Sequence, residues 1–228
     1  MKPPFIGRGI SLLVMLGVVV WWGARVMSGH AAEPKGAFPV PAQDAKLAAQ
    51  AGKETAVFAG GCFWGVQGVF QHVKGVLQVT SGYSGGNVES PYYELVSSGS
   101  TGHAESVQVV YDPSQISYGT LLMIFFSVAH DPTQKDRQGP DIGTQYRSAI
   151  FFKTEEQKKI AEAYIAQIDA AKVYERPMAT QVAPFSAFYP AEDYHQNYLT
   201  KHPNDPYISF NDLPKLERLK SRYPELSR

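Results

Sequence analysis

The pattern of apolar and polar residues between positions 54 and 205 predicts short strands that alternate with helices. Short apolar runs and strict alternation favour strands, whereas apolar residues that recur every three or four positions favour helices. By these criteria the strands cover 55–59, 75–83, 104–111, 147–152 and 180–183. The helices cover 63–73, 117–128, 154–171 and 191–200. The loops cover 90–102, which has room for one helical turn, and 130–143.

The order of these elements, β-α-β-β-α-β-α-β, is typical of an α/β or α+β fold. We therefore expect a compact two-layer domain in which helices pack on a mixed sheet with partly antiparallel strands. Two predicted helices begin at capping residues. Ser117 precedes one helix, and Thr154 forms a capping box with Gln157 at the start of another. We find no internal repeat and no further domain boundary after residue 53.

The N-terminal residues have the pattern of a signal peptide. Lys2 and Arg8 are followed by an uncharged, largely apolar stretch that ends at Arg25. This stretch is shorter than the ~20 residues that span a bilayer comfortably. Small residues follow it, as they do before a signal-peptidase site. We predict cleavage after Ala31, export of the protein and a periplasmic location.

An uncleaved anchor is the alternative. In that case Trp21 and Trp22 lie at the headgroup level, and the inner membrane holds the protein so that it faces the periplasm. Either way, residues 1–31 form the signal peptide or N-terminal membrane anchor. Residues 32–53, rich in Ala, Pro, Lys and Gln, form a flexible linker, and residues 54–228 form a single domain. We expect a monomer.

Charge and histidine spacing exclude several classes of function. The 21 basic and 21 acidic residues give a formal net charge of +0, so nucleic-acid binding has no electrostatic support. None of the six histidines has a spacing typical of a metal site. We interpret His130 and His195 as polar groups of a loop and a helix. We expect no bound metal, and no Walker loop or dinucleotide fingerprint is present.

The 228 residues contain one cysteine, Cys62, in the run Gly-Gly-Cys-Phe-Trp-Gly at 60–65. With no partner for an internal disulfide, it is either an inert core residue or a reactive thiol. The run joins a predicted strand to a predicted helix, where unpaired N–H groups and the positive end of the helix dipole point at the sulfur. Such a position can lower a thiol pKa from ~8.5 to ~7 or below. This placement favours a nucleophile.

Glu105 stands near the start of an otherwise apolar predicted strand. If it is half-buried, desolvation raises its pKa. Keeping the proton near pH 7 needs a shift of roughly 2–3 units from ~4.3, or ~3–4 kcal/mol. The rings of Phe63 and Trp64 could supply the apolar wall. An edge-strand carboxylate that meets solvent explains the spacing equally well.

Tyr93 and Tyr146 lie in polar segments and have phenols that can donate hydrogen bonds to an oxygen without ionising. Either tyrosine alone is more often an ordinary surface or core aromatic. Beside a thiol and a neutral acid, however, they suit a small ligand with a polar head and an apolar end. Nucleophile and acid would then act on one pair of atoms.

Four motifs together carry a resemblance to a known family. They are G-C-F-W-G at 61–65, G-H-A-E at 102–105, D-I-G-T-Q-Y-R-S at 141–148 and A-E-D-Y-H-Q at 191–196. In this order, within residues 54–205, they closely resemble peptide methionine sulfoxide reductase A. The resemblance implies that Cys62 attacks the sulfur of methionine S-sulfoxide, in oxidised proteins or peptides or as the free amino acid, and is left as a sulfenic acid.

The resemblance also implies roles for seven other residues. The departing oxygen would be protonated by Glu105 and bound by Tyr93 and Tyr146. The methyl group of the substrate would be held by Phe63 and Trp64. The remaining implied site residues are Tyr194, which binds substrate, and Asp141, which supports the site.

Recycling of the sulfenic acid needs a second thiol. Many members of the family carry further cysteines in a C-terminal tail, and this chain has none. We therefore expect no bound cofactor and an external thiol reductant, either a thioredoxin-like protein, a glutaredoxin or a small thiol. The implied function is repair of proteins under oxidative stress.

Two alternatives remain open at this point. A one-cysteine thiol peroxidase also passes through a sulfenic acid, but it needs an arginine or threonine beside the sulfur, and the neighbours of Cys62 are Gly, Phe and Trp. A non-catalytic envelope binding module, in which Cys62 only packs, would keep its ligand binding after Cys62→Ser. The enzyme would lose all reduction.

Overall fold

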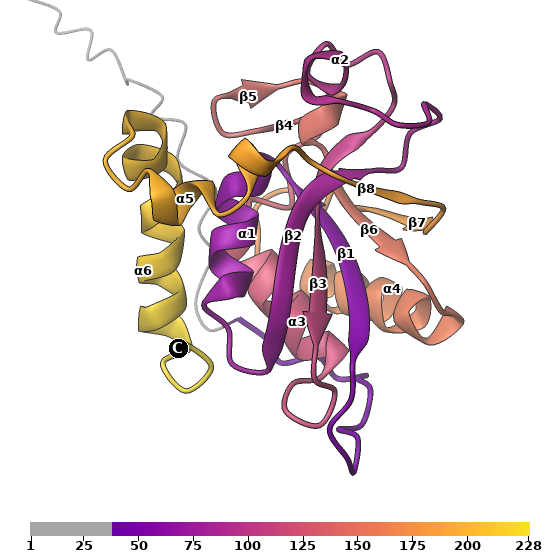
Figure 1. Cartoon of the computed structure of the whole chain (residues 1–228). Coiled ribbons are helices and arrows are strands. Elements are labelled where there is room, and N and C mark those ends of the chain that lie inside the picture. The colour runs from indigo at the N-terminus through magenta and orange to yellow at the C-terminus, as the bar shows by residue number, and fades with distance from the viewer. Residues whose placement is uncertain (1–37) are drawn as a thin grey trace, which may run out of the picture.

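The structure, a computed structural model, describes residues 38–228 and contains a six-stranded sheet in the order β7-β6-β1-β3-β2-β8 (Figure 1). The strands of this sheet are β1 (Glu54–Gly60), β2 (Val76–Ser84), β3 (Ala104–Tyr111), β6 (Ser148–Phe152), β7 (Gln181–Pro184) and β8 (Phe188–Pro190). A separate hairpin pairs β4 (Arg137–Gln138) with β5 (Asp141–Ile142). The α-helices are α1 (Phe63–Gln71), α2 (Tyr93–Ser97), α3 (Tyr118–Ile124), α4 (Glu155–Ala170), α5 (Tyr198–Lys201) and α6 (Leu213–Arg222).

The predicted mixed sheet is confirmed. Neighbouring strands of the large sheet pair antiparallel, except β6 and β7, which are parallel and are connected through α4. Strand β3 lies between β1 and β2, so it is a central strand rather than an edge. At the start of β3, Glu105 pairs with Tyr83 of β2, and the pairing with β1 begins at Val107.

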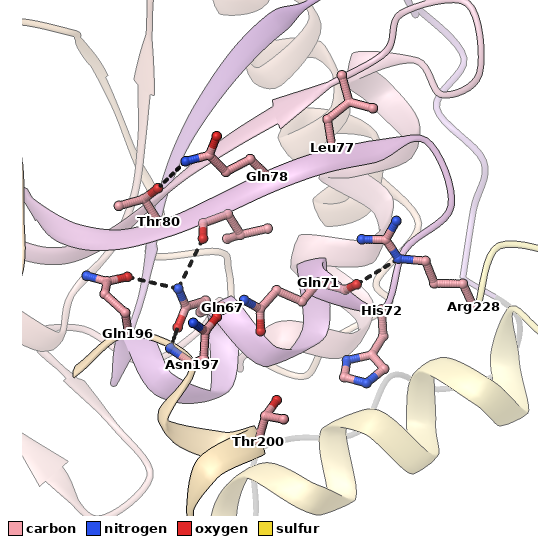
Figure 2. A pocket seen from close by; sticks show the side chains of 11 residues that line it. Gln67, Gln71, His72, Leu77, Gln78, Thr80, Gln196, Asn197, Thr200 and Arg228 are labelled. Carbon is pink, nitrogen blue, oxygen red and sulfur yellow. Dashed lines mark hydrogen bonds between the residues drawn. The ribbon is translucent and has the colours of Figure 1, made fainter. Parts of the chain in front are cut away.

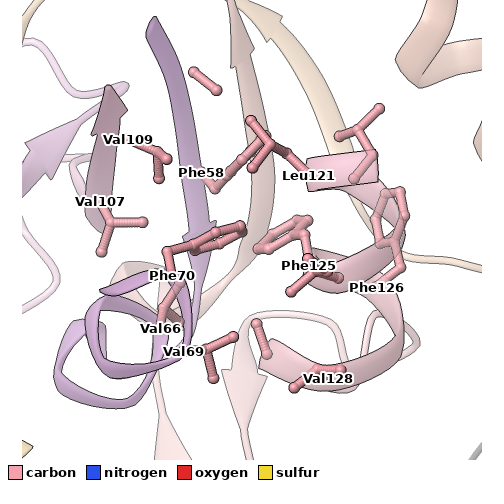
Figure 3. Close-up of a cluster of buried hydrophobic side chains, with 14 of the residues drawn as sticks. Phe58, Val66, Val69, Phe70, Val107, Val109, Leu121, Phe125, Phe126 and Val128 are labelled. Atoms are coloured by element: carbon pink, nitrogen blue, oxygen red, sulfur yellow. The ribbon is translucent and has the colours of Figure 1, made fainter. Parts of the chain in front are cut away.

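The core lies between one face of the sheet and the helices. Phe58 of β1 stacks on Phe70 of α1 at a centroid distance of 5.4 Å and on Phe125, just after α3, at 4.9 Å (Figure 3). The side chains of β1 alternate between the two faces: Phe58 joins this large cluster, whereas Val57 joins a smaller one on the other face. This period of two is what the apolar run of β1 requires in a sheet with both faces covered.

Both predicted helix caps are confirmed. The Ser117 side chain accepts a hydrogen bond from the Thr120 N–H at the start of α3, and the Thr154 side chain accepts one from the Gln157 N–H at the start of α4. The Gln157 side chain accepts from the Lys153 N–H, one residue before the capping residue. Each cap satisfies donors that the first turn of a helix leaves unpaired.

The predicted single helix over 191–200 is wrong. A 3-10 turn (Asp193–His195) is followed by Asn197 with φ +59°, and α5 begins only after it. The left-handed residue interrupts helical geometry, and Asn is among the few residues that adopt it readily. Where one helix was predicted over 117–128, α3 ends at Ile124 and a π-helical turn (Phe125–Ala129) follows it. The sequence prediction also missed β8, α6 and the β4–β5 hairpin.

The segment after β8 wraps around α1. Two residues that follow α6 bond to the end of α1. The Leu226 carbonyl accepts from the Lys74 N–H over 2.8 Å, and the Arg228 N–H donates to the His72 carbonyl over 2.9 Å. These bonds hold the end of α1. At its start, α1 contacts the π-helical turn (Ile208–Asp212) that leads into α6. The helix that follows Cys62 is therefore held at both ends by the C-terminal segment.

The predicted signal peptide, residues 1–31, lies outside the described residues. The predicted flexible linker, 32–53, is described from Phe38, and that part contacts the domain. The Phe38 ring packs on Tyr164, whose hydroxyl donates to the Pro39 carbonyl over 2.6 Å. Asp44 accepts a hydrogen bond from the Gly119 N–H over 2.7 Å. Within residues 38–228, no helix has both the length and the apolar character needed to span a bilayer.

Candidate active site

Cys62 lies at the turn between β1 and α1, as the sequence predicts. Gly61 has φ +84°, and a Cβ there would overlap the Gln138 side chain. Glycine is therefore required both by the backbone conformation and by the space available. Cys62 itself stands at the N-cap position of α1 and is 9% exposed.

The prediction of a lowered thiol pKa is wrong for the protein without substrate. Burial raises the pKa of the Cys62 thiol well above its usual value, and the negative charge of Glu105 and then of Asp212 raises it further. A hydrogen bond from the backbone N–H of Trp64 acts in the expected direction but is a smaller effect. Desolvation and the two carboxyl groups outweigh the helix N-terminus, so the resting sulfur is a neutral thiol.

Glu105 is buried, with 3% of its surface exposed. The edge-strand alternative is wrong because β3 is central. Its carboxyl group accepts a hydrogen bond from the Phe63 N–H over 3.0 Å. Burial raises the pKa of Glu105 to about 8, against the opposing effect of that hydrogen bond. The group therefore carries its proton at neutral pH, as a proton donor requires.

A small cavity collects most of the predicted site residues. It has a volume of about 190 Å³. It is lined by Cys62, Phe63, Trp64, Tyr93, Glu105, Asp141, Tyr146 and Tyr207. Tyr194 is the predicted site residue that does not line it. Tyr194 is 55% exposed, and its ring centroid lies 4.2 Å from that of His195.

Tyr207 is a lining residue that the sequence reasoning missed. Its hydroxyl donates a hydrogen bond to the Asp141 carboxylate. Burial raises the pKa of Asp141, while this hydrogen bond lowers it. Tyr207 follows the last recognised motif and precedes α6, so no local pattern marks it. Its packing on Trp64, edge to face at 6.0 Å, exists only in the folded chain.

Tyr93 and Tyr146 present neutral phenols to the cavity. Burial raises the pKa of Tyr93 to about 12 and raises that of Tyr146 as well. Tyr93 is the first residue of α2, and its N–H donates to Glu192 over 2.9 Å. The other carboxylate oxygen of Glu192 accepts from the Tyr83 hydroxyl over 2.8 Å. A distant carboxylate thus caps α2 and holds Tyr93 at the site.

His195 fixes the indole of Trp64. The indole N–H donates to His195 Nδ1 over 3.1 Å, and the indole stacks on Tyr198 with ring centroids 3.7 Å apart. His195 is 2% exposed, and burial lowers its pKa, so the imidazole is neutral and can accept that bond. The sequence reading of His195 as a polar group of a helix missed this role.

A larger hollow lies elsewhere, beside α1 and β2 (Figure 2). Its volume is about 660 Å³, and its lining is rich in amide side chains, among them Gln67, Gln71 and Gln196. Several of these bond to one another, as Gln67 does to Gln196 over 3.0 Å. The lining contains no thiol and no carboxylate side chain. Within residues 38–228, no group of His, Cys, Asp or Glu side chains could hold a metal ion. Of these two hollows, only the smaller one brings a thiol together with carboxyl groups, so we place the chemistry there.

Comparison with known sequences agrees with this site. Residues 54–226 match the family model described as "Peptide methionine sulfoxide reductase". The chain is 59% identical to "Peptide methionine sulfoxide reductase MsrA 2" of Mesorhizobium japonicum, over 77% of this chain and 90% of that protein. It is 49% identical to "Peptide methionine sulfoxide reductase MsrA" of Thermus thermophilus, over 77% of this chain and 98% of that protein.

Two solved structures have a similar fold. One is reduced Mxr1 from Saccharomyces cerevisiae, with a TM-score of 0.63 and 30% identity over 74% of this chain and 95% of that chain. The other is methionine sulfoxide reductase A of Corynebacterium diphtheriae, with a TM-score of 0.60 and 36% identity over 75% of this chain and 88% of that chain.

Proposed function

The chain belongs to the peptide methionine sulfoxide reductase family and is an enzyme that reduces methionine sulfoxide in protein repair; from this premise we propose how its residues perform the reaction. Cys62 is the nucleophile that attacks the sulfoxide sulfur of the S epimer. Glu105 is the acid that protonates the departing oxygen, and Tyr93 and Tyr146 bind that oxygen. The observation that carries this assignment is that these groups line one cavity.

The atoms and electrons balance within the site. The sulfoxide sulfur gains two electrons and becomes a thioether, while Cys62 loses two and takes the oxygen as a sulfenic acid. Glu105 gives its proton to that oxygen, and its carboxylate then takes the proton of the thiol. The acid is thus restored. A sulfoxide oxygen leaves poorly until it is protonated, so the raised pKa of Glu105 supplies what the step needs.

The neutral resting thiol has a place in this scheme. In the free protein the thiolate is disfavoured chiefly by burial, and the protonated Glu105 has no free carboxylate to take the thiol proton. Transfer of the Glu105 proton toward a bound sulfoxide would create the carboxylate that receives the thiol proton. Nucleophile and acid are therefore activated together, and only when substrate fills the cavity. A resting thiol is also less easily oxidised than a thiolate.

Phe63, Trp64 and Tyr207 form the apolar part of the cavity, and we assign the methyl group of the substrate to Phe63 and Trp64. The indole orientation is supported by the bond to His195 and the stack on Tyr198. Asp141 supports the site through its hydrogen bond from Tyr207. Tyr194 lies outside the cavity lining, so any contact it makes with substrate would involve the part of the polypeptide that remains outside.

The alternatives of a thiol peroxidase and a non-catalytic binding module do not fit. A peroxidase needs an arginine or threonine beside the sulfur, and neither residue type lines the cavity that holds Cys62. A binding module in which Cys62 only packs has no use for an acid that keeps its proton.

The test is a stoichiometric reaction of reduced protein with a methionine S-sulfoxide peptide and no added reductant. We expect one equivalent of methionine per protein and a trapped sulfenic acid at Cys62. Cys62→Ser should give none. Equal consumption of the R epimer, or faster turnover of hydrogen peroxide than of the sulfoxide, would contradict the proposal.

Recycling by an external thiol follows from the single cysteine of the sequence. The reductant's first thiol would form a mixed disulfide with Cys62 and release water, and a second thiol would release the reduced enzyme. We propose a thioredoxin-like protein, a glutaredoxin or a small thiol in this role. Steady-state turnover with each reductant in turn would identify it.

Export to the periplasm remains part of this proposal, with cleavage after Ala31 or an uncleaved anchor as its two forms. It is supported by the basic start and apolar stretch of the N-terminal sequence. The intact mass of the protein from cells, together with its partition between soluble and membrane fractions, distinguishes the two forms. A full-length protein in the cytosolic fraction would contradict both.

A further inference from the structure

A buried ion pair lies directly against the first turn of α1. Asp212 is 1% exposed, and its Oδ1 accepts a hydrogen bond from Lys215 Nζ over 2.9 Å. A Cβ added at Gly65 would collide with both the Asp212 carboxylate and the Lys215 ammonium group. The pair therefore packs on the backbone of the G-C-F-W-G motif, three residues after Cys62.

This pair is not an ordinary helix-surface pair. The Lys215 side chain is 13% exposed and that of Asp212 is 0% exposed, so both charges are largely removed from water. The second carboxylate oxygen of Asp212 accepts no hydrogen bond from any residue of the described chain. Burying charges in this way is unfavourable unless something else gains from it. If the only role of these residues were to pack the C-terminal segment on α1, uncharged side chains could fill it.

The surroundings of Cys62 contain several acidic groups from different elements. Negative charge reaches the thiol from Glu105 of β3, Asp141 of β5 and Asp212 before α6. The ionisable hydroxyl groups that share these electrostatics are those of Tyr93, Tyr146, Tyr198 and Tyr207. Lys215 supplies positive charge to the acidic groups themselves, since it favours the ionised forms of Asp141 and Asp212.

We propose that Asp212 and Lys215 form a charge-positioning pair for Cys62, in which Asp212 holds the lysine beside the first turn of α1 and the lysine offsets the negative charge around the thiol. The idea rests on the proposed role of Cys62 as the nucleophile. Neither residue touches the reacting atoms. Both act by setting how readily the sulfur ionises when its proton leaves.

The test is the pH dependence of Cys62 alkylation by iodoacetamide in the reduced full-length protein. Lys215→Met removes the cation and should move the midpoint up by roughly half a pH unit or more, which lowers the rate at a fixed pH below the midpoint about threefold. Asp212→Asn removes the anion, but its amide oxygen can still accept the hydrogen bond from Lys215 Nζ and keep the cation in place, so the midpoint should move down. The double variant should lie between them.

The diagnostic result is that Lys215→Met and Asp212→Asn shift the alkylation midpoint in opposite directions. If the pair only supported the packing of α1, both variants would loosen the same turn and would move the alkylation profile in the same direction or leave its midpoint unchanged. Either of those outcomes would overturn the proposal. Lys215→Arg keeps the positive charge, so its alkylation midpoint should equal that of the wild type. A raised midpoint in this variant, with folding verified by circular dichroism, would also overturn it.

The chain offers a matched control on the same helix. Glu217 and Lys220 form a second pair with the same i,i+3 spacing, at 3.8 Å, but their side chains are 77% and 55% exposed. Glu217→Gln and Lys220→Met should leave the alkylation midpoint unchanged. Because alkylation needs no sulfoxide turnover, its result is independent of the stoichiometric test of the proposed function.

Discussion

The backbone N–H of Phe63 donates to the Glu105 carboxyl group over 3.0 Å, so the first residue of α1 is bonded to the second residue of β3. Because one oxygen of Glu105 takes this bond, the other oxygen is the natural place for its proton. The bond also ties the position of the acid to the turn that carries Cys62. A shift of α1 would therefore move nucleophile and acid together.

Glu105→Gln should slow the reductive step by about 10²- to 10⁴-fold at pH 7, because the amide keeps the hydrogen bond from Phe63 but has no proton to give. In the wild type the acid form is present below a pKa of about 8, so the rate should fall as the pH rises through 8. Single-turnover formation of methionine from pH 6 to 9 measures both effects. A rate within threefold of the wild type would rule out Glu105 as the acid.

The raised pKa of Glu105 should also appear in stability. The unfolded chain releases this proton near pH 4.5, whereas the folded protein keeps it until about pH 8. The unfolded state therefore binds fewer protons, and the free energy of unfolding falls as the pH rises through this window.

Urea unfolding at pH 5 and pH 7.5 would measure this effect. Relative to Glu105→Gln, the wild type should lose about 3 kcal/mol between the two pH values, at ~1.4 kcal/mol per pH unit. Glu217→Gln, at an exposed position of α6, is the control and should follow the wild type. A constant difference between wild type and Glu105→Gln would show that Glu105 ionises normally.

Tyr207→Phe should reduce kcat/KM about tenfold, because the Asp141 carboxyl group loses the hydroxyl that bonds to it. That bond lowers the pKa of Asp141. Its loss should therefore shift the acidic limb of the activity profile to higher pH. Tyr92→Phe, at a position 52% exposed, is the matched control. An unchanged acidic limb would show that Asp141 does not depend on Tyr207.

Gly61→Ala should destabilise the protein by about 1–3 kcal/mol, because alanine adopts φ +84° only with strain and its methyl group would overlap Gln138. Gly52→Ala is the control, since a methyl group there would lie 3.7 Å from Pro113, an ordinary contact. Unfolding midpoints in urea at pH 7 compare the two variants. Equal midpoints would mean that the turn before Cys62 adapts without strain.

Local patterns in the sequence predicted the parts of the fold that local physics determines. The strand before Cys62, the glycine turn and the caps at Ser117 and Thr154 are set by neighbouring residues, and the structure contains all of them. The helix over 191–200 was wrong because Asn197 takes a left-handed conformation that its neighbours do not announce.

The environment of the site depends on tertiary packing and was predicted less well. The burial of Glu105 could not be decided from spacing because the residues around it, such as Tyr83 of β2 and Phe63 of α1, come from other parts of the sequence. The thiol pKa was wrong in sign because the helix N-terminus is a local effect, whereas burial and the Glu105 charge come from the fold. Tyr207 and Asp212 come from a segment with no motif, and only its packing on α1 brings them to the site.

The contacts between the C-terminal segment and α1 have a consequence for how the protein is made. The bonds of Leu226 and Arg228 to the end of α1, and the packing of Asp212 against its first turn, involve residues that a ribosome adds long after Cys62. Because synthesis runs from the N-terminus and native contacts can form only between residues already made, the reactive thiol emerges long before its enclosure is complete. A growing chain therefore exposes Cys62 to oxidants and to other thiols until the segment from Asp212 to Arg228 has been made and has packed on α1.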